Sequence, residues 1–351
     1  MLDAFPEPVQ VAFVGLIGGI LLGLAARIGR FCTLGAIEDL FYGENTLRLR
    51  MWGIAIGVAV IGTFALSAGG LLDLQQTLYL SRDWNPLASI FGGLVFGYGM
   101  ALAGNCGYGA LARVGGGDLR SLLIVLIMGI SAYVTLGGPL SALRIFVFGG
   151  AEQSTSFPTL AHAAAELTGL PLNMTGIVIG GFILVLTVLN RSLRNSVSHI
   201  IWGAVAGLAI VSGWAGTQWV ASNGFDATPV VSHTFSAPIG ETVLYVMTSS
   251  GNTISFGTGS VVGVLLGALI GSLIKGHFRW EACDDPRELR RQILGAALMG
   301  MGAVIAVGCS VGQGLSAFSV LAYSAPVTLL CIMGGAAIGL RQLILGFAPP
   351  V

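Results

Sequence analysis

Three of the five cysteines in this sequence stand at the ends of apolar segments, each in the same setting of glycines. Cys32, Cys106 and Cys309 all have a glycine fourteen residues before, a second nine residues before and a third three residues after. A protonated thiol is a weak donor and a polarizable acceptor, and it suits a soft sulfur atom better than a hard oxyanion. In apolar surroundings these thiols should stay protonated. The pattern therefore indicates a repeated unit that can contact a sulfur-containing anion. The glycines are Gly18, Gly23 and Gly35, then Gly92, Gly97 and Gly109, then Gly295, Gly300 and Gly312.

Glycines next to the thiols predict that the helices break at these points. Gly104 and Gly107 flank Cys106, and Gly308 precedes Cys309. Each glycine in a helix interior costs about 1 kcal/mol relative to alanine. A helix that restarts after the break presents free amides and a positive dipole end, which favour an anion. We expect short helices over 33–42, 107–114 and 310–323, with Asn105, Ser310 and Gln313 as candidates to contact the oxygen atoms of that anion.

The repeat extends to a fourth, degenerate unit. Gly203, Gly207 and Gly213 align with Gly19, Gly23 and Gly29, and the cysteine position then falls on Gly216. The chain is thus predicted to hold four related units of a helix followed by a break, arranged in two halves. Backbone breaks within a membrane must be buried by protein or line a wet cavity, so the three thiols should meet at one constriction.

The composition is typical of a polytopic membrane protein. The chain is 54% hydrophobic and 9% charged, whereas soluble domains carry about 25% charged residues. A net charge of zero and a single lysine exclude the usual basic surface for nucleic acid. No positive segment precedes the first apolar run, so we expect no cleaved signal peptide. Nine helices of about 17 to 25 apolar residues are expected, over residues 9–28, 51–70, 88–105, 119–137, 172–190, 198–215, 256–274, 290–307 and 325–345.

Two polar stretches separate some of these spans. Residues 159–168 are predicted to form an interfacial helix between Pro158 and Gly169. Residues 217–255 are rich in Ser, Thr and Asn and could fold over a vestibule. The predicted organisation is a first half over 1–171, a connecting helix over 172–197 and a second half over 198–351.

Arginines set the expected orientation. With the N-terminus outside and the C-terminus in the cytoplasm, most arginines of the connections lie inside, as the positive-inside rule requires. The spans before Cys32 and Cys106 then run inward, whereas the span before Cys309 runs outward. Inverted halves with broken helices are the architecture of many transporters, whose site lies near the midplane. Arg27, Arg30 and Arg113 either snorkel to the cytoplasmic surface or contact the anion.

Other chemistries fit the sequence less well. Residues 107–112 and 312–317 both match G-x-G-x-x-A, but neither follows a strand, so we predict no dinucleotide cofactor. A metal site of three thiolates is disfavoured because the histidines lie in loops or at a span end. Cys283 and Cys331 have no repeat context and are interpreted as structural. A buried cysteine that only packs remains an alternative for the other three.

The three motifs resemble those of the YeeE/YedE family of sulfur-transport membrane proteins. They read Arg-Phe-Cys-Thr-Leu-Gly at 30–35, Gly-Asn-Cys-Gly-Tyr-Gly at 104–109 and Gly-Cys-Ser-Val-Gly-Gln-Gly at 308–314. The resemblance implies an hourglass-shaped inner-membrane protein of prokaryotes that takes up thiosulfate, with Cys32, Cys106 and Cys309 relaying the ion. It also implies a cytoplasmic partner, a small TusA-like sulfurtransferase. Some family members are linked to selenium or to other sulfur compounds.

These observations together predict an all-α transporter in the lipid bilayer that is not an enzyme. Thiosulfate would pass between Cys106, Cys32 and Cys309, in that assumed order. One alternative is a membrane thiol-redox or persulfide-transfer protein, which needs an activated thiol and a resolving thiol within disulfide distance. The other is a purely structural subunit.

Overall fold

The protein is an all-α polytopic membrane protein. The computed structural model describes residues 6–149, 159–225, 227–281 and 286–345. The long helices are α1 (Glu7–Arg27), α3 (Leu47–Ala68), α4 (Pro86–Ala103), α6 (Leu119–Leu136), α9 (Leu172–Val188), α11 (Val197–Asn223), α13 (Phe256–Lys275), α14 (Pro286–Ile305) and α15 (Ser324–Leu345). Shorter elements are α2 (Thr33–Phe41), α5 (Gly107–Val114), α7 (Ser141–Phe148), α8 (Leu160–Thr168), α10 (Arg191–Arg194), α12 (Ser236–Thr248), the 3-10 turn η2 (Leu74–Gln76) and the π-helix η3 (Gly312–Ala317).

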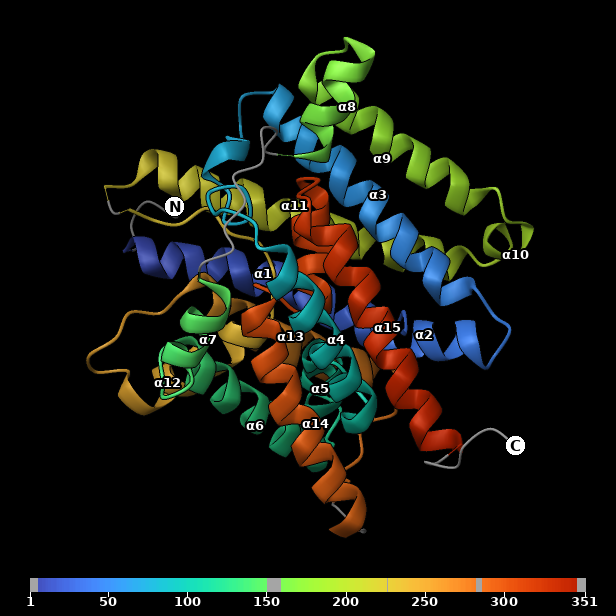
Figure 1. The fold of residues 1–351 in the computed structure, drawn as a ribbon, viewed down its shortest axis with the longest axis vertical. Coiled ribbons are helices and arrows are strands. Elements are labelled where there is room, and N and C mark those ends of the chain that lie inside the picture. The colour runs from blue at the N-terminus through green and yellow to red at the C-terminus, as the bar shows by residue number, and fades with distance from the viewer. Residues whose placement is uncertain (1–5, 150–158, 226, 282–285, 346–351) are drawn as a thin grey trace.

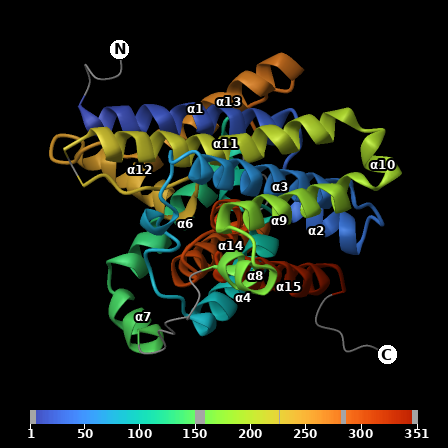
Figure 2. The same cartoon turned by 90° about the horizontal axis from the view of Figure 1, so that it is seen from above.

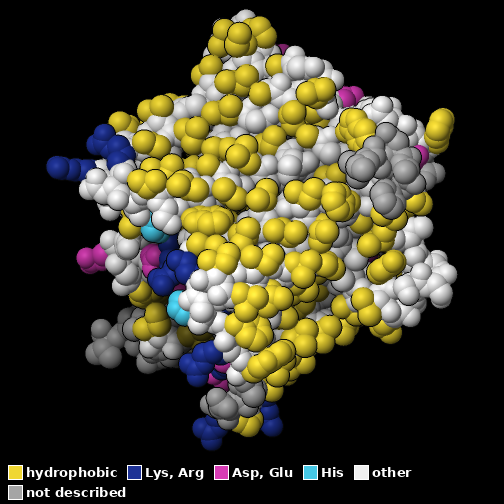
Figure 3. All heavy atoms as spheres, turned by 180° about the vertical axis from the view of Figure 1, so that it is seen from behind, with side chains coloured by type: hydrophobic (Ala, Val, Ile, Leu, Met, Phe, Trp, Pro, Cys, Tyr) yellow, Lys and Arg dark blue, Asp and Glu magenta, His cyan; other side chains and the backbone are white. Residues whose placement is uncertain are grey.

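Each of the nine expected spans coincides with one of the long helices. Within the described residues, seven helices are long and apolar enough to cross a membrane, and the pair α8 and α9, bent by 104°, adds an eighth if it counts as one span. Helix α14 does not qualify because its first turns carry Arg287, Glu288, Arg290 and Arg291. The polytopic class is therefore confirmed, whereas the count of nine spans is not. Figure 3 shows the broad hydrophobic face, with Lys and Arg gathered along one edge and at the lower end.

The long helices form two bundles. The first contains α1, α3, α9, α11 and α13, and the second contains α4, α6, α14 and α15 (Figures 1 and 2). Four short elements, α2, α5, α12 and η3, each pack against helices of both bundles. The segments that were predicted to follow the helix breaks therefore connect the bundles.

Glycine stripes set the closest helix contacts. Gly15, Gly19 and Gly23 of α1 face α13, and a Cβ on Gly19 would collide with the Ser260 carbonyl oxygen. Small residues let helix backbones approach closely within a membrane. The same principle applies where Gly97 of α4 meets the Ile332 carbonyl of α15. The glycines repeated along the sequence thus have a second use, which is packing.

The order of contacts gives the direction of each pair. Helices α1 and α13 run parallel, as do α3 with α11, α4 with α15 and α6 with α14. Helices α1 and α11 run antiparallel, because Val14 of α1 meets Gly216 whereas Gly29 meets Trp202. Helices α4 and α14 are likewise antiparallel.

One expectation about this part of the chain is wrong. Gly216 lies inside the continuous helix α11, so the fourth unit has no break there. Its missing side chain instead admits Val14 of α1. The polar stretch 217–255 contains the end of α11 and the whole of α12. Pro238 stands in the first turn of α12, where proline is tolerated. The expected interfacial helix is present as α8, capped by Thr159 and ended by Gly169.

Candidate functional site

The three repeated cysteines occupy the same place in three copies of one local structure. Cys32 and Cys106 are the N-cap residues of α2 and α5, and Cys309 precedes η3. Each sulfur atom accepts a hydrogen bond from the backbone N–H three residues later, at 3.5 Å for Cys32, 3.3 Å for Cys106 and 3.4 Å for Cys309. The glycine that follows each cysteine in the repeat provides this donor. The predicted short helices over 33–42 and 107–114 are present, and 310–323 contains η3.

The backbone turns in the same way before each cysteine. The residue two positions earlier has a positive φ in all three units, 56° at Arg30, 75° at Gly104 and 55° at Val307. A non-glycine residue in this region costs about 1–2 kcal/mol, so Arg30 and Val307 are held there by their surroundings. Of the three units, only that of Cys106 has a glycine, Gly104, at this position. The sequence pattern predicted the breaks but not these two strained residues.

The thiols lie close to one another at the junction of the bundles. Cys106 and Cys309 are buried, whereas Cys32 is partly exposed. Cys106 has both Cys32 and Cys309 among its neighbours. The Ser310 hydroxyl is fully buried and lies beside the Cys106 thiol, within hydrogen-bonding reach of the sulfur.

Aromatic rings surround the thiols. Phe31 stacks on Trp52 with ring centroids 4.6 Å apart and meets the edge of Tyr108 at 6.4 Å. Tyr108 in turn contacts Phe235 at 5.4 Å, and its hydroxyl donates to the Leu22 carbonyl. We call these four rings the aromatic collar. An anion that reaches the thiols must give up part of its hydration shell, because apolar rings replace water around it.

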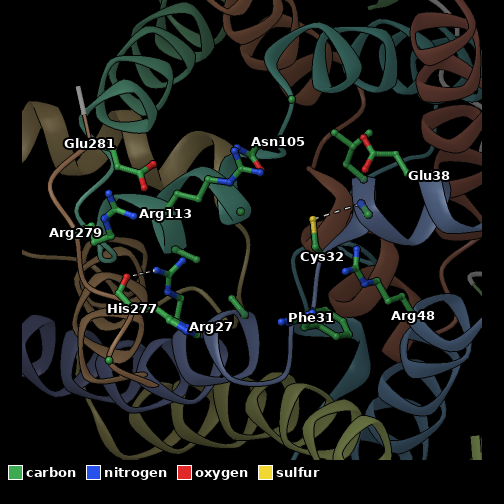
Figure 4. A pocket seen from close by; sticks show the side chains of 18 residues that line it. Arg27, Phe31, Cys32, Glu38, Arg48, Asn105, Arg113, His277, Arg279 and Glu281 are labelled. Carbon is green, nitrogen blue, oxygen red and sulfur yellow. Dashed lines mark hydrogen bonds between the residues drawn. The ribbon is translucent and has the colours of Figure 1, made fainter. Parts of the chain in front are cut away.

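A cavity of about 570 Å³ opens to Cys32 from the side of the α1 C-terminus. We call it the basic vestibule, because five arginines and two glutamates line it. Figure 4 shows Arg27, Arg113 and Arg279 on one side and Cys32, Glu38 and Arg48 on the other. The charged lining residues are Arg27, Arg30, Arg48, Arg113, Arg279, Glu38 and Glu281.

A second cavity, of about 470 Å³, approaches from the side of the α1 N-terminus. We call it the apolar vestibule; its lining includes Pro8, Val11 and Phe256, with Glu241 as the charged residue. Thr234 also lines it, and the Thr234 hydroxyl lies 3.6 Å from the Cys309 sulfur. The two vestibules therefore reach opposite ends of the row of thiols.

The other candidate residues fall into different positions. Gly104 and Asn105 line the basic vestibule. Gln313 belongs to η3, and its side-chain amide donates to the carbonyls of Ala306 and Val307, which follow α14, at 2.8 Å and 3.0 Å. Both of its N–H groups are thus used within the protein. Gly107 lies against Met128, and Gly308 lies against Gln313.

The structure adds residues that sequence reasoning missed. Residues 230–235 cross between α11 and η3, and the backbone N–H of Phe235 donates to the Cys309 sulfur at 3.4 Å. Tyr79, from the connection between α3 and α4, lies near Thr234 and Cys309. Neither segment carries a sequence pattern that could have indicated this.

Comparisons with known proteins show the family to which the chain is related. A family model described as sulphur transport matches residues 28–338. A protein of Escherichia coli (strain K12) named thiosulfate transporter TsuA is 27% identical over 337 residues, which cover 92% of this chain and 91% of that protein. A protein of the same name from Spirochaeta thermophila is 26% identical over 322 residues, 89% of this chain and 93% of that protein.

Proposed function

The chain belongs to the sulphur transport family, and from this premise we propose that it takes up thiosulfate across the prokaryotic inner membrane. The observation that carries the proposal is the row of three thiols between two vestibules. Thiosulfate would enter by the apolar vestibule, meet Cys309, then Cys106, and leave past Cys32. This order differs from the one assumed from the sequence. Cys32 in the lining of the basic vestibule, and Thr234 of the apolar vestibule beside Cys309, support it.

Each thiol would contact the terminal sulfur of the ion without forming a bond to it. The Cys106 sulfur is already a hydrogen-bond acceptor for Gly109 N–H, which leaves its own S–H free to donate to an anion. The Ser310 hydroxyl, which lies beside the Cys106 thiol, is the first candidate for the oxygen atoms. Asn105 is the second, at the entrance to the basic vestibule.

The aromatic collar favours a soft anion over sulfate. Sulfate offers four hard, strongly hydrated oxygen atoms, and neither thiols nor aromatic rings replace that water well. Thiosulfate offers one polarizable sulfur atom, which tolerates such surroundings. A selenium analogue would share this property, so a related selenium or sulfur anion stays the alternative cargo.

We also propose inverted halves, 1–171 and 198–351, with the connecting helix in 172–197. Exchange of the halves pairs α1 with α11, α3 with α13, α4 with α14 and α6 with α15. Under this exchange, the parallel pair α1 and α13 corresponds to the parallel pair α11 and α3. The parallel pair α4 and α15 corresponds in the same way to α14 and α6. The two self-related pairs, α1 with α11 and α4 with α14, are antiparallel, as a two-fold axis in the membrane plane requires. The packing supports the proposal.

The basic vestibule would face the cytoplasm, with the N-terminus outside. Its excess of arginines agrees with the positive-inside rule. It could also receive an acidic surface of the TusA-like sulfurtransferase that the resemblance implies. The rival redox function would need an activated thiolate, which a neighbouring basic group would favour. The buried sulfur atoms of Cys106 and Cys309 instead accept from backbone N–H groups, and Cys309 also lies beside the Thr234 hydroxyl.

The test is uptake of thiosulfate labelled at its terminal sulfur by proteoliposomes of the purified protein. Uptake that unlabelled thiosulfate suppresses at much lower concentration than sulfate would support the proposal. Wild-type vesicles that take up no more label than protein-free vesicles would contradict it. Persistent label on Cys106 by mass spectrometry would instead favour the redox and persulfide-transfer alternative.

A further inference from the structure

Residues 230–235, which we call the strap, are held firmly beside Cys309. Side chains or backbone groups from α11, α13, η3 and the α3–α4 connection all bind to this segment. The contacts are Leu78 N to Val230 O, Thr217 Oγ1 with the backbone of Val231, Ser232 Oγ to Ile210 O, His233 Nδ1 with Ser260 Oγ at 2.6 Å, and Ser316 Oγ to His233 O at 2.7 Å. Because four elements fix the strap, the groups at its end have defined positions.

The end of the strap supplies two polar groups to one sulfur atom. Phe235 N–H donates to Cys309 Sγ at 3.4 Å, and Thr234 Oγ1 lies 3.6 Å from the same atom. Thr234 also lines the apolar vestibule, whereas Cys309 is only 1% exposed. An anion that moves from this vestibule toward the thiols therefore reaches Thr234 first.

A second hydroxyl converges on the same place. A Cβ atom on Gly312 would lie 2.5 Å from Thr234 Oγ1 and 2.9 Å from the Tyr79 hydroxyl oxygen. Because Gly312 has no side chain, both hydroxyls can approach its backbone, next to the N–H that donates to Cys309. The Thr234 and Tyr79 hydroxyls also lie within hydrogen-bonding reach of each other. Tyr79 also lines a cavity of about 80 Å³ together with Arg82. Asp83, of opposite charge to Arg82, lines that cavity as well.

We propose that Tyr79, Thr234 and Cys309 form a subsite that binds thiosulfate by both of its ends. The hydroxyls of Tyr79 and Thr234 donate to the oxygen atoms, and the Cys309 thiol contacts the terminal sulfur. Hydroxyls suit hard oxygen acceptors, whereas the thiol suits a polarizable atom. The ion is thereby oriented with its terminal sulfur toward the row of thiols. This inference rests on the proposed function and names the residues that would select the ion and orient it.

The first test removes one hydroxyl at a time. Thr234→Val and Tyr79→Phe keep the shape of the side chain, and each should raise the KM for thiosulfate uptake about tenfold, the effect of one lost hydrogen bond to an anion. The maximal rate should change much less. Thr234→Ser should restore the wild-type KM, which a purely structural role of the residue would not predict. Thr228→Val, in the same vestibule, and Tyr323→Phe, which stacks on Trp84, are the matched controls.

A second test separates the two ends of the ion. Thr234→Val should weaken inhibition by sulfate and affinity for thiosulfate by the same factor, because both anions carry the oxygen atoms that lose a donor. Cys309→Ser should weaken thiosulfate alone, because only this ion presents a soft sulfur. The same KM in Thr234→Val and Tyr79→Phe as in the wild type would overturn the subsite, as would failure of Thr234→Ser to restore it. Wild-type protein without uptake would overturn the proposed function and the subsite together.

Discussion

The sulfur atom of Cys106 has two separable tasks in this structure. It caps α5 by accepting from Gly109 N–H, and it is the central thiol of the proposed path. Serine caps helices as well as any residue, whereas alanine cannot cap. The two substitutions therefore distinguish a packing and capping role from a role in transport.

Cys106→Ser should abolish most thiosulfate uptake while leaving thermal stability close to that of the wild type. Cys106→Ala should abolish uptake as well and also lower the free energy of unfolding by about 1 kcal/mol, through loss of the cap. Uptake by proteoliposomes and thermal unfolding in detergent measure the two effects. Full uptake by the serine variant would show that the sulfur atom is not needed.

Arg113 lines the basic vestibule, and its charge should attract the divalent ion there. Arg113→Gln should raise the KM about threefold at 0.1 M salt when thiosulfate is presented from this side, and less at 1 M salt, where the Debye length is about 3 Å. Arg194→Gln is the control, because Arg194 lies on α10 outside the vestibule. An equal effect at both salt concentrations would argue against an electrostatic role.

Helix pairs in this protein depend on glycines that have no room for a methyl group. In Gly19→Ala the new Cβ would meet backbone atoms of Ser260 and Gly263 of α13. We expect a loss of about 1–3 kcal/mol in the free energy of unfolding, as for other overpacked interfaces. Gly181→Ala in α9 is the matched control, because no atom lies within 4 Å of its Cβ position. That variant should be neutral or slightly more stable, and equal loss in both variants would contradict the packing argument.

The sequence predicted the helices well where one local property, such as apolar length or a glycine break, determines where a helix begins and ends. Apolar length located each long helix, and glycines next to Cys32 and Cys106 located the starts of α2 and α5. The same signal failed at Gly216, because a glycine serves either a break or a close helix contact, and only the neighbour, Val14, decides which. Gln313 was expected to contact the ion. Its side-chain amide instead donates to a backbone carbonyl that follows α14, which the sequence pattern does not indicate.

The site was predictable only in part for the same reason. The three thiols form a repeat and can be found from spacing. Thr234 and Tyr79 lie in irregular connections, and they reach Cys309 only after the strap is bound by several distant elements. Neither segment contains a sequence pattern that indicates this arrangement.

The whole molecule should show different access to its thiols from its two sides. In a variant with Cys283→Ser and Cys331→Ala, a maleimide that cannot cross membranes should react with Cys32 from the basic vestibule and much more slowly with Cys106 and Cys309. Thiosulfate should slow the reaction of Cys32. Intact cells and inside-out vesicles, compared by mass spectrometry, show which side that vestibule faces. Faster labelling of Cys309 than of Cys32 would contradict the proposed arrangement.

The division into two bundles also determines how the protein could open. Cys32 is joined to α1 and α3 of the first bundle, whereas Cys106 and Cys309 follow α4 and α14 of the second. Glycine contacts keep each bundle internally tight, so a rocking motion would be concentrated at the seam between them. The motion would reach the thiols through the short elements that follow them, because α2, α5 and η3 each contact both bundles. Cys309 is also bound to the strap, which α11 and α13 of the first bundle hold. We therefore expect the distances among the three sulfur atoms to change as the bundles rock, so that opening of the protein and passage of the ion are coupled.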